Sequence, residues 1–177
     1  MTLAAGMAIG LFVQVGLIAH MFSLLVPALG AQLAGLAMGA ATAAAIGGRT
    51  LVGWLMPAGA DRRLVACANA VVQIVGSLAF MAAGANVPLL VAGVLLFGVG
   101  IGNATSLPPL IAQSEFVEAD VGRVVSLIVA TSQAAYAFAP AAFGVIRELT
   151  AADGGALFAA AAVIQAASIV VFLAGRR

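Results

Sequence analysis

Few side chains that could carry chemistry lie inside the long apolar stretches of this chain. His20 is the only histidine, and it falls roughly 9 Å from the centre of its apolar run at the helical rise of about 1.5 Å per residue. Because an imidazole gains or loses a proton near neutral pH, His20 could serve proton coupling or hold an anionic group. The alternative is a histidine that packs near the edge of the apolar layer and is bonded to a neighbouring helix.

A second candidate group lies near position 136. Gln133, Tyr136 and Pro140 are three and four residues apart, so they share one face of a helix. If that face lines a cavity, the amide and the phenol offer hydrogen-bond donors and acceptors beside a proline kink. No Asp or Glu occurs in the middle of any apolar run, so a proton relay made of carboxylates is not expected.

Enzyme chemistry finds no support in the residue types. The chain has one histidine and one cysteine, Cys67, and contains neither an H-E-x-x-H nor a G-x-S-x-G motif. We therefore expect no catalytic centre, no metal site and no cofactor. The net charge of +1 provides no basic surface for nucleic acid.

The elements that must position these residues are long and apolar. Hydrophobic residues make up 64% of the chain and charged residues only 7%, which is too apolar for a soluble domain. The apolar runs are each long enough to cross about 30 Å of hydrocarbon as a helix. They predict an all-α integral membrane protein, one domain over residues 1–177, with six helices at about 3–26, 29–48, 64–84, 87–107, 124–146 and 155–174.

The arginines predict the orientation of these helices. Six fall in the breaks on one side or in the C-terminal tail, and only Arg147 falls on the other side. By the positive-inside rule both termini are cytoplasmic, in a multi-pass protein of the cell membrane. The six are Arg49, Arg62, Arg63, Arg123, Arg176 and Arg177.

Small residues and prolines predict how the helices meet. Gly35 and Gly39 form a GxxxG within a stripe of small residues, and Gly98 and Gly102 repeat the spacing in the fourth helix. Such stripes let helices approach closely, either for static packing or as a smooth surface on which helices slide. Pro27 is expected to separate the first two helices, Pro108 and Pro109 to end or bend the fourth, and Pro140 to kink the fifth.

One loop carries a recognisable motif. The stretch from Gly48 to Leu55, with Arg49, Gly53 and Trp54, followed by Asp61, Arg62 and Arg63, resembles the G-R-x-x-x-G-W-L…D-R motif of major facilitator superfamily transporters. The region from Pro140 to Glu148, with Gly155 and Phe158, is similar to that family's junction of the eleventh and twelfth helices. The insertion 56–60 departs from the family spacing before Asp61.

The resemblance implies a fold and a role for the whole chain. It aligns the chain with the C-terminal six-helix half of the family, a bundle of 3+3 inverted repeats with the motif in a cytoplasmic gating loop. Asp61 would hold Arg62 or an arginine of a neighbouring helix as a latch, or the arginines would only contact lipid headgroups. On the helices that resemble the cavity-lining set, further candidates are Gln14, Gln32 and Asn103, each also able to bond a neighbouring helix.

These observations lead to two functional hypotheses. The first is a secondary transporter of a small solute in the lipid bilayer, completed by a missing N-terminal half or by a second copy of the chain. The second is a truncated or scaffold membrane protein without transport activity of its own.

Overall fold

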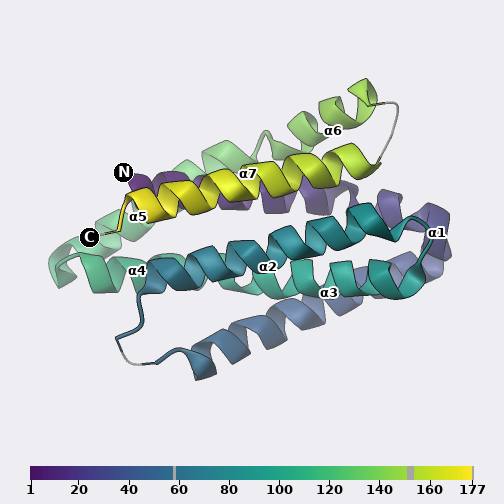
Figure 1. The fold of residues 1–177 in the computed structure, drawn as a ribbon. Coiled ribbons are helices and arrows are strands. Elements are labelled where there is room, and N and C mark those ends of the chain that lie inside the picture. The colour runs from purple at the N-terminus through teal and green to yellow at the C-terminus, as the bar shows by residue number, and fades with distance from the viewer. Residues whose placement is uncertain (58, 151–153, 177) are drawn as a thin grey trace.

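Every element in the described part of the chain is a helix. The computed structural model describes residues 1–57, 59–150 and 154–176. The helices are α1 (Thr2–Leu55), α2 (Arg62–Ala83), α3 (Val87–Ala104), α4 (Leu107–Glu115), α5 (Glu118–Tyr136), α6 (Ala139–Leu149) and α7 (Gly154–Ala174). Figure 1 shows them packed side by side along one common direction.

The first helix reverses its direction at a glycine. At about 1.5 Å per residue, the 54 residues of α1 would span about 80 Å if they were straight. Gly30 has φ 73° and ψ 163°, a backbone conformation that residues with a Cβ rarely adopt, and the chain turns back there (Figure 1). The break is therefore at Gly30 and not at the predicted Pro27, which lies inside the helix.

The other prolines for which a helix break was predicted, Pro108, Pro109 and Pro140, lie where helices begin. α3 ends at Ala104, three residues before the predicted end, and α4 starts with Pro108 and Pro109 in its first turn. The predicted fifth helix, 124–146, is instead two helices, α5 and α6, separated by Ala137 and Phe138. A proline at the start of a helix costs no hydrogen bond, because the first amide groups have no partner within the helix.

The described helices have the apolar length that a membrane requires. By length and composition, five helical segments could cross a bilayer: α1, α2, α3, the stretch Glu118–Leu149 that contains α5 and α6, and α7. Large apolar side chains are exposed along them, including Leu36, Val163 and Val170. Exposure of this kind suits contact with lipid, because a protein surface in water would not leave so many apolar side chains uncovered.

The closest helix contact joins α3 to the second segment of α1, residues 31–55. A Cβ added to Gly98 would lie 2.6 Å from the carbonyl oxygen of Ala41, and one added to Gly102 would overlap the carbonyl group of Ala45. Gly35 and Gly39, by contrast, have open space where a Cβ would be, so they make no close contact with the residues that the structure describes. Of the two predicted pairs, only Gly98 and Gly102 bring helices together here.

Both ends of the chain lie at the same end of the bundle (Figure 1). The end of α1, the start of α2, α4, the start of α5 and the end of α7 gather there as well. These elements carry Arg49, Arg62, Arg63, Arg123 and Arg176, while Arg147 is near the end of α6, at the opposite end. Arg177 lies outside the described residues.

Candidate functional site

The Gly-Arg motif lies on a helix and fastens it to a neighbour. α1 continues through Leu55, so Gly48, Arg49 and Gly53 are helical. Arg49 donates from Nε to the carbonyl oxygen of Gly102 at 2.8 Å and from Nη2 to Thr105 Oγ1 at 2.7 Å. Carbonyl groups in the last turn of a helix lack backbone donors, and a cation is favourable there. Arg49 therefore caps the end of α3, a helix other than its own.

Asp61 lies in the loop that follows and has two contacts. Its Oδ1 accepts from the backbone amides of Arg63 and Leu64 at 3.0 and 3.2 Å, which caps the start of α2. Its Oδ2 accepts from Arg176 Nε at 2.8 Å. Partial burial alone would raise the pKa of this carboxyl, but the hydrogen bonds from Leu64, Arg176 and Arg63 outweigh it and lower the pKa.

Arg62 and Arg63 are both held by carbonyl or carboxylate oxygens. Arg62 donates from Nη1 to the carbonyl oxygen of Leu110 in α4. Arg63 is 5% exposed and binds both carboxylate oxygens of Glu115, with 2.8 Å between Nη2 and Oε2. Its Nη1 also donates to Thr2 Oγ1 and to the carbonyl oxygen of Phe172, each at 3.2 Å. Arg63 thus joins α1, α2, α4 and α7 at one point.

Sequence reasoning missed the partner of Arg63. Glu115 was not among the predicted residues. A signal was present, because Glu115 is the one carboxylate that directly ends the apolar segment after Pro108 and Pro109. Nothing in the linear sequence pairs it with an arginine 52 positions earlier.

His20 reaches the break between α5 and α6. Its Nε2 lies 3.0 Å from the carbonyl oxygen of Pro140, in the first turn of α6. Close packing accompanies this contact, since a Cβ on Gly16 would lie 2.4 Å from the ring of Phe143 if nothing moved, too close to be tolerated. Ser23, one turn further along α1, accepts from Arg147 Nη1 at 2.8 Å. The first segment of α1, residues 2–29, therefore holds α6 at two polar points.

Three of the predicted cavity residues face away from the bundle core. Gln32 and Gln133 are exposed, and Tyr136 is half-buried. None of the three side chains hydrogen-bonds to another residue within the described ranges. They remain available to a solute or to a second protein surface.

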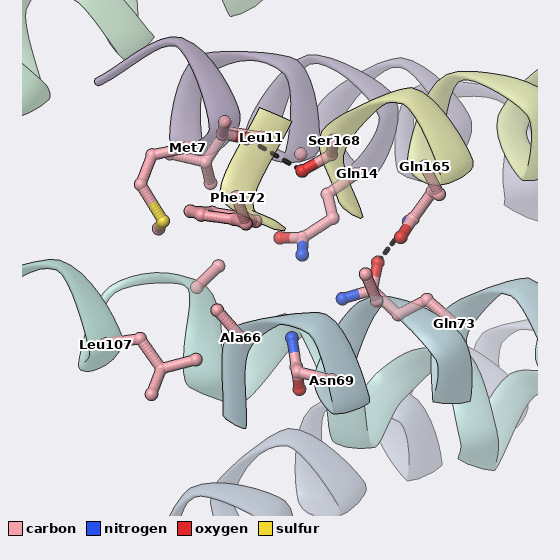
Figure 2. A pocket seen from close by; sticks show the side chains of 14 residues that line it. Met7, Leu11, Gln14, Ala66, Asn69, Gln73, Leu107, Gln165, Ser168 and Phe172 are labelled. Atoms are coloured by element: carbon pink, nitrogen blue, oxygen red, sulfur yellow. Dashed lines mark hydrogen bonds between the residues drawn. The ribbon is translucent and has the colours of Figure 1, made fainter. Parts of the chain in front are cut away.

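The other two predicted cavity residues, Gln14 and Asn103, point into the bundle. Asn103 donates from Nδ2 to Asn69 Oδ1 at 3.1 Å, and Asn69 donates to the carbonyl oxygen of Gly100 at 3.0 Å. Gln14 is 5% exposed and lines a cavity of about 30 Å³ beside Asn69 and Gln73 (Figure 2). Gln73 accepts a hydrogen bond from Gln165 Nε2. Of the six cavity candidates, Gln14 and Asn103 therefore lie inside the bundle, near Asn69, Gln73 and Gln165, which were not among the predicted residues.

Comparisons with known proteins bear on the fold. No protein-family model matches the chain, and no curated protein matches it. Among solved structures the chain is similar to the POT family transporter PepTSo, with a TM-score of 0.82 and 17% sequence identity. The similarity covers 99% of this chain and 36% of the transporter, so the chain spans about a third of the length of the protein that it resembles. At this identity the likeness establishes a transporter-like helical fold.

Proposed function

We propose that this chain is one six-helix half of a secondary transporter of the major facilitator type, which moves a small solute by alternating access. The observation that carries the proposal is the similarity of nearly the whole chain to about a third of a solved transporter. The motif around Arg49 and Asp61 supports it independently, because it comes from the sequence alone.

In this proposal the chain crosses the membrane six times. The two segments of α1, residues 2–29 and 31–55, are separate crossings joined at Gly30, and α5 with α6 forms one broken crossing. The arginine-rich end, where both termini lie, faces the cytoplasm of a cell membrane. Broken helices are tolerated at membrane depth where protein or water covers the freed backbone groups.

The solute would bind on the polar face that this chain leaves uncovered. Gln133 and Tyr136 share one face of α5 and provide an amide and a phenol group, and His20 lies beside the break that follows Tyr136. Gln32 is a further exposed amide, on the second segment of α1. A single half leaves this face open. Its occupant would be a missing N-terminal half or a second copy of the chain, and the solute would lie between the two bundles near the midplane.

The arginine contacts would hold the six-helix half together as a rigid body during alternating access. Arg49, Arg63 and Arg176 all bind groups of this same chain. An arginine that latched the two halves together would instead have its partner on the other bundle. We therefore assign these side chains to holding α1, α2, α3, α4 and α7 together as one moving body.

An uptake screen tests the proposal. The chain is reconstituted in liposomes alone and together with a candidate first half, and uptake of sugars, carboxylates, drugs and ions is measured. Gln133→Leu and Tyr136→Phe should reduce uptake, while Val163→Ala, at a side chain that is 70% exposed on α7, should not. No uptake by any combination, in protein that remains folded, would contradict the proposal.

A scaffold role is the second candidate, favoured by the open stripe on α1. Gly35 and Gly39 have nothing within 4 Å of an added Cβ, so another helix could approach this face closely. A scaffold would self-associate or bind a partner in liposomes without moving any solute. Loss of that association in Gly35→Leu, together with absent uptake, would favour this function over transport.

A further inference from the structure

A small cavity lies inside the bundle, apart from the exposed polar face. It is lined by the first segment of α1, by α2 and by α7, together with Ala104 of α3 and Leu107 of α4. Its volume is about 30 Å³. Amide and hydroxyl groups line it at the level of Gln14, Gln73 and Gln165, each near the middle of its helix, while Met7 and Phe172 lie nearer the arginine-rich end (Figure 2).

Gln14 is the side chain that this cavity leaves without a partner. It is 5% exposed, its carboxamide points into the cavity, and it hydrogen-bonds to no side chain or backbone group of the described residues. An amide that is withdrawn from bulk water and has no hydrogen-bond partner is unfavourable. A ligand that supplied the missing hydrogen bonds would recover much of the lost free energy.

The neighbouring amides are only partly satisfied. Gln73 uses its Oε1 to accept from Gln165, and its amide nitrogen donates to no described residue. Asn69 donates one amide hydrogen to Gly100, accepts from Asn103 and lines the cavity. Gln14 and Gln73 thus provide the free donors and acceptors on opposite sides of the same small space.

The size and charge of the cavity select the ligand. A water molecule needs at least about 10–15 Å³ of this kind of volume and two to four polar partners, and both are present. Binding sites for organic solutes are about ten times larger or more. No charged side chain lines the cavity, so an ion at this depth would have no counter-charge and would bind at high cost.

We propose that this cavity is a binding site for an internal water molecule, which joins Gln14 of α1 to Gln73 of α2. The water molecule forms hydrogen bonds to both amides and so bridges the two helices. This site is separate from the face assigned to the solute, and its existence does not depend on transport.

Footprinting with X-ray-generated hydroxyl radicals tests the site in the full chain, held in lipid nanodiscs. Radicals form from water, so a buried side chain beside a bound water is oxidised faster than one in a dry core. Met7 lines the cavity and is 5% exposed, while Met21 is 1% exposed within the apolar core. We expect Met7 to be oxidised several-fold faster than Met21. Equal rates would overturn the proposal.

A variant separates bound water from access by bulk solvent. Gln14→Leu conserves most of the side-chain volume and removes the polar group, so the oxidation rate of Met7 should fall to that of Met21. Gln133→Leu, the same change at an exposed position, should leave both rates as in the wild type. An unchanged Met7 rate in Gln14→Leu would mean that bulk solvent reaches Met7, and would overturn the assignment. If Gln14→Leu does not fold, equal oxidation of Met7 and Met21 in the wild type would still overturn the proposal.

Discussion

His20 Nε2 lies 3.0 Å from the carbonyl oxygen of Pro140, and this contact links the first segment of α1 to the break between α5 and α6. A carbonyl oxygen only accepts hydrogen bonds, so the proton of the imidazole must be on Nε2. The contact therefore sets the tautomer of His20 and joins α1 to the first turn of α6.

Removal of this contact should loosen α6. We expect His20→Ala to destabilise the protein by about 0.6–1.7 kcal/mol, the range measured for hydrogen bonds between membrane helices. Thermal unfolding in detergent measures the change. Thr131→Ala is the control, because Thr131 bonds only to its own helix, and an equal loss in both variants would contradict a specific link to Pro140.

The ion pair of Arg63 and Glu115 should be the polar contact with the largest effect on stability. Glu115→Gln leaves the 5%-exposed guanidinium without its counter-charge. Breaking a fully buried pair costs about 3–5 kcal/mol, and because Glu115 is 30% exposed we expect about 2 kcal/mol. The double variant Arg63→Met with Glu115→Met should recover much of the loss in the same unfolding assay. A double variant as unstable as Glu115→Gln would show that the single loss does not come from an unpaired charge.

Glycines with the same four-residue spacing should differ sharply in how well they tolerate substitution by alanine. Gly102→Ala places a methyl group into the carbonyl of Ala45 and should destabilise by about 1–3 kcal/mol, the usual cost of overpacking. Gly35→Ala and Gly39→Ala meet open space and should be neutral or slightly stabilising, because alanine favours helix. Fluorescence-detected unfolding of the three variants measures this difference. If Gly35→Ala destabilised the isolated chain as much as Gly102→Ala, this would contradict the observed packing.

Acid should remove the contribution of Asp61. Its pKa is lowered by the hydrogen bonds that it accepts, so its stabilising effect is present above the ordinary value of 3.8 and is lost as the pH falls through the lowered pKa. Asp61→Asn keeps a residue that caps helices well but removes the charge facing Arg176. We expect a difference from wild type of at most about 1 kcal/mol at neutral pH, because both side chains are more than a third exposed. Denaturant unfolding across acid pH measures it, and a difference that grew on acidification would be the contrary result.

The orientation can be tested with fusions. A reporter that is active only outside the cytoplasm should be silent after Arg177 and active when inserted after Thr150. This follows from the arginine distribution, with Arg147 alone on the opposite side. Activity of the fusion after Arg177 would reverse the proposed topology.

The linear sequence contained enough to predict the class of protein. Uninterrupted apolar runs near 20 residues leave few alternatives, because unpaired backbone groups are too costly in hydrocarbon. An all-helical fold with membrane-length helices and a likeness to a transporter is what the structure and its comparison support. The prolines also predicted two helix breaks close to where the structure has them, before Pro108 and before Pro140.

Only the tertiary structure decided which polar side chains face each other. Helical spacing placed Gln133 and Tyr136 on one face, but it could not separate Gln14 and Asn103, which point into the bundle, from Gln32, which is exposed. The physical reason is that lipid and protein interior are equally apolar, so hydrophobic periodicity does not mark the side of a membrane helix that meets its neighbours. The pairing of Arg63 with Glu115 joins residues 52 positions apart and depends on how α2 packs against α4. The turn at Gly30 depends on a backbone conformation that the packed fold selects.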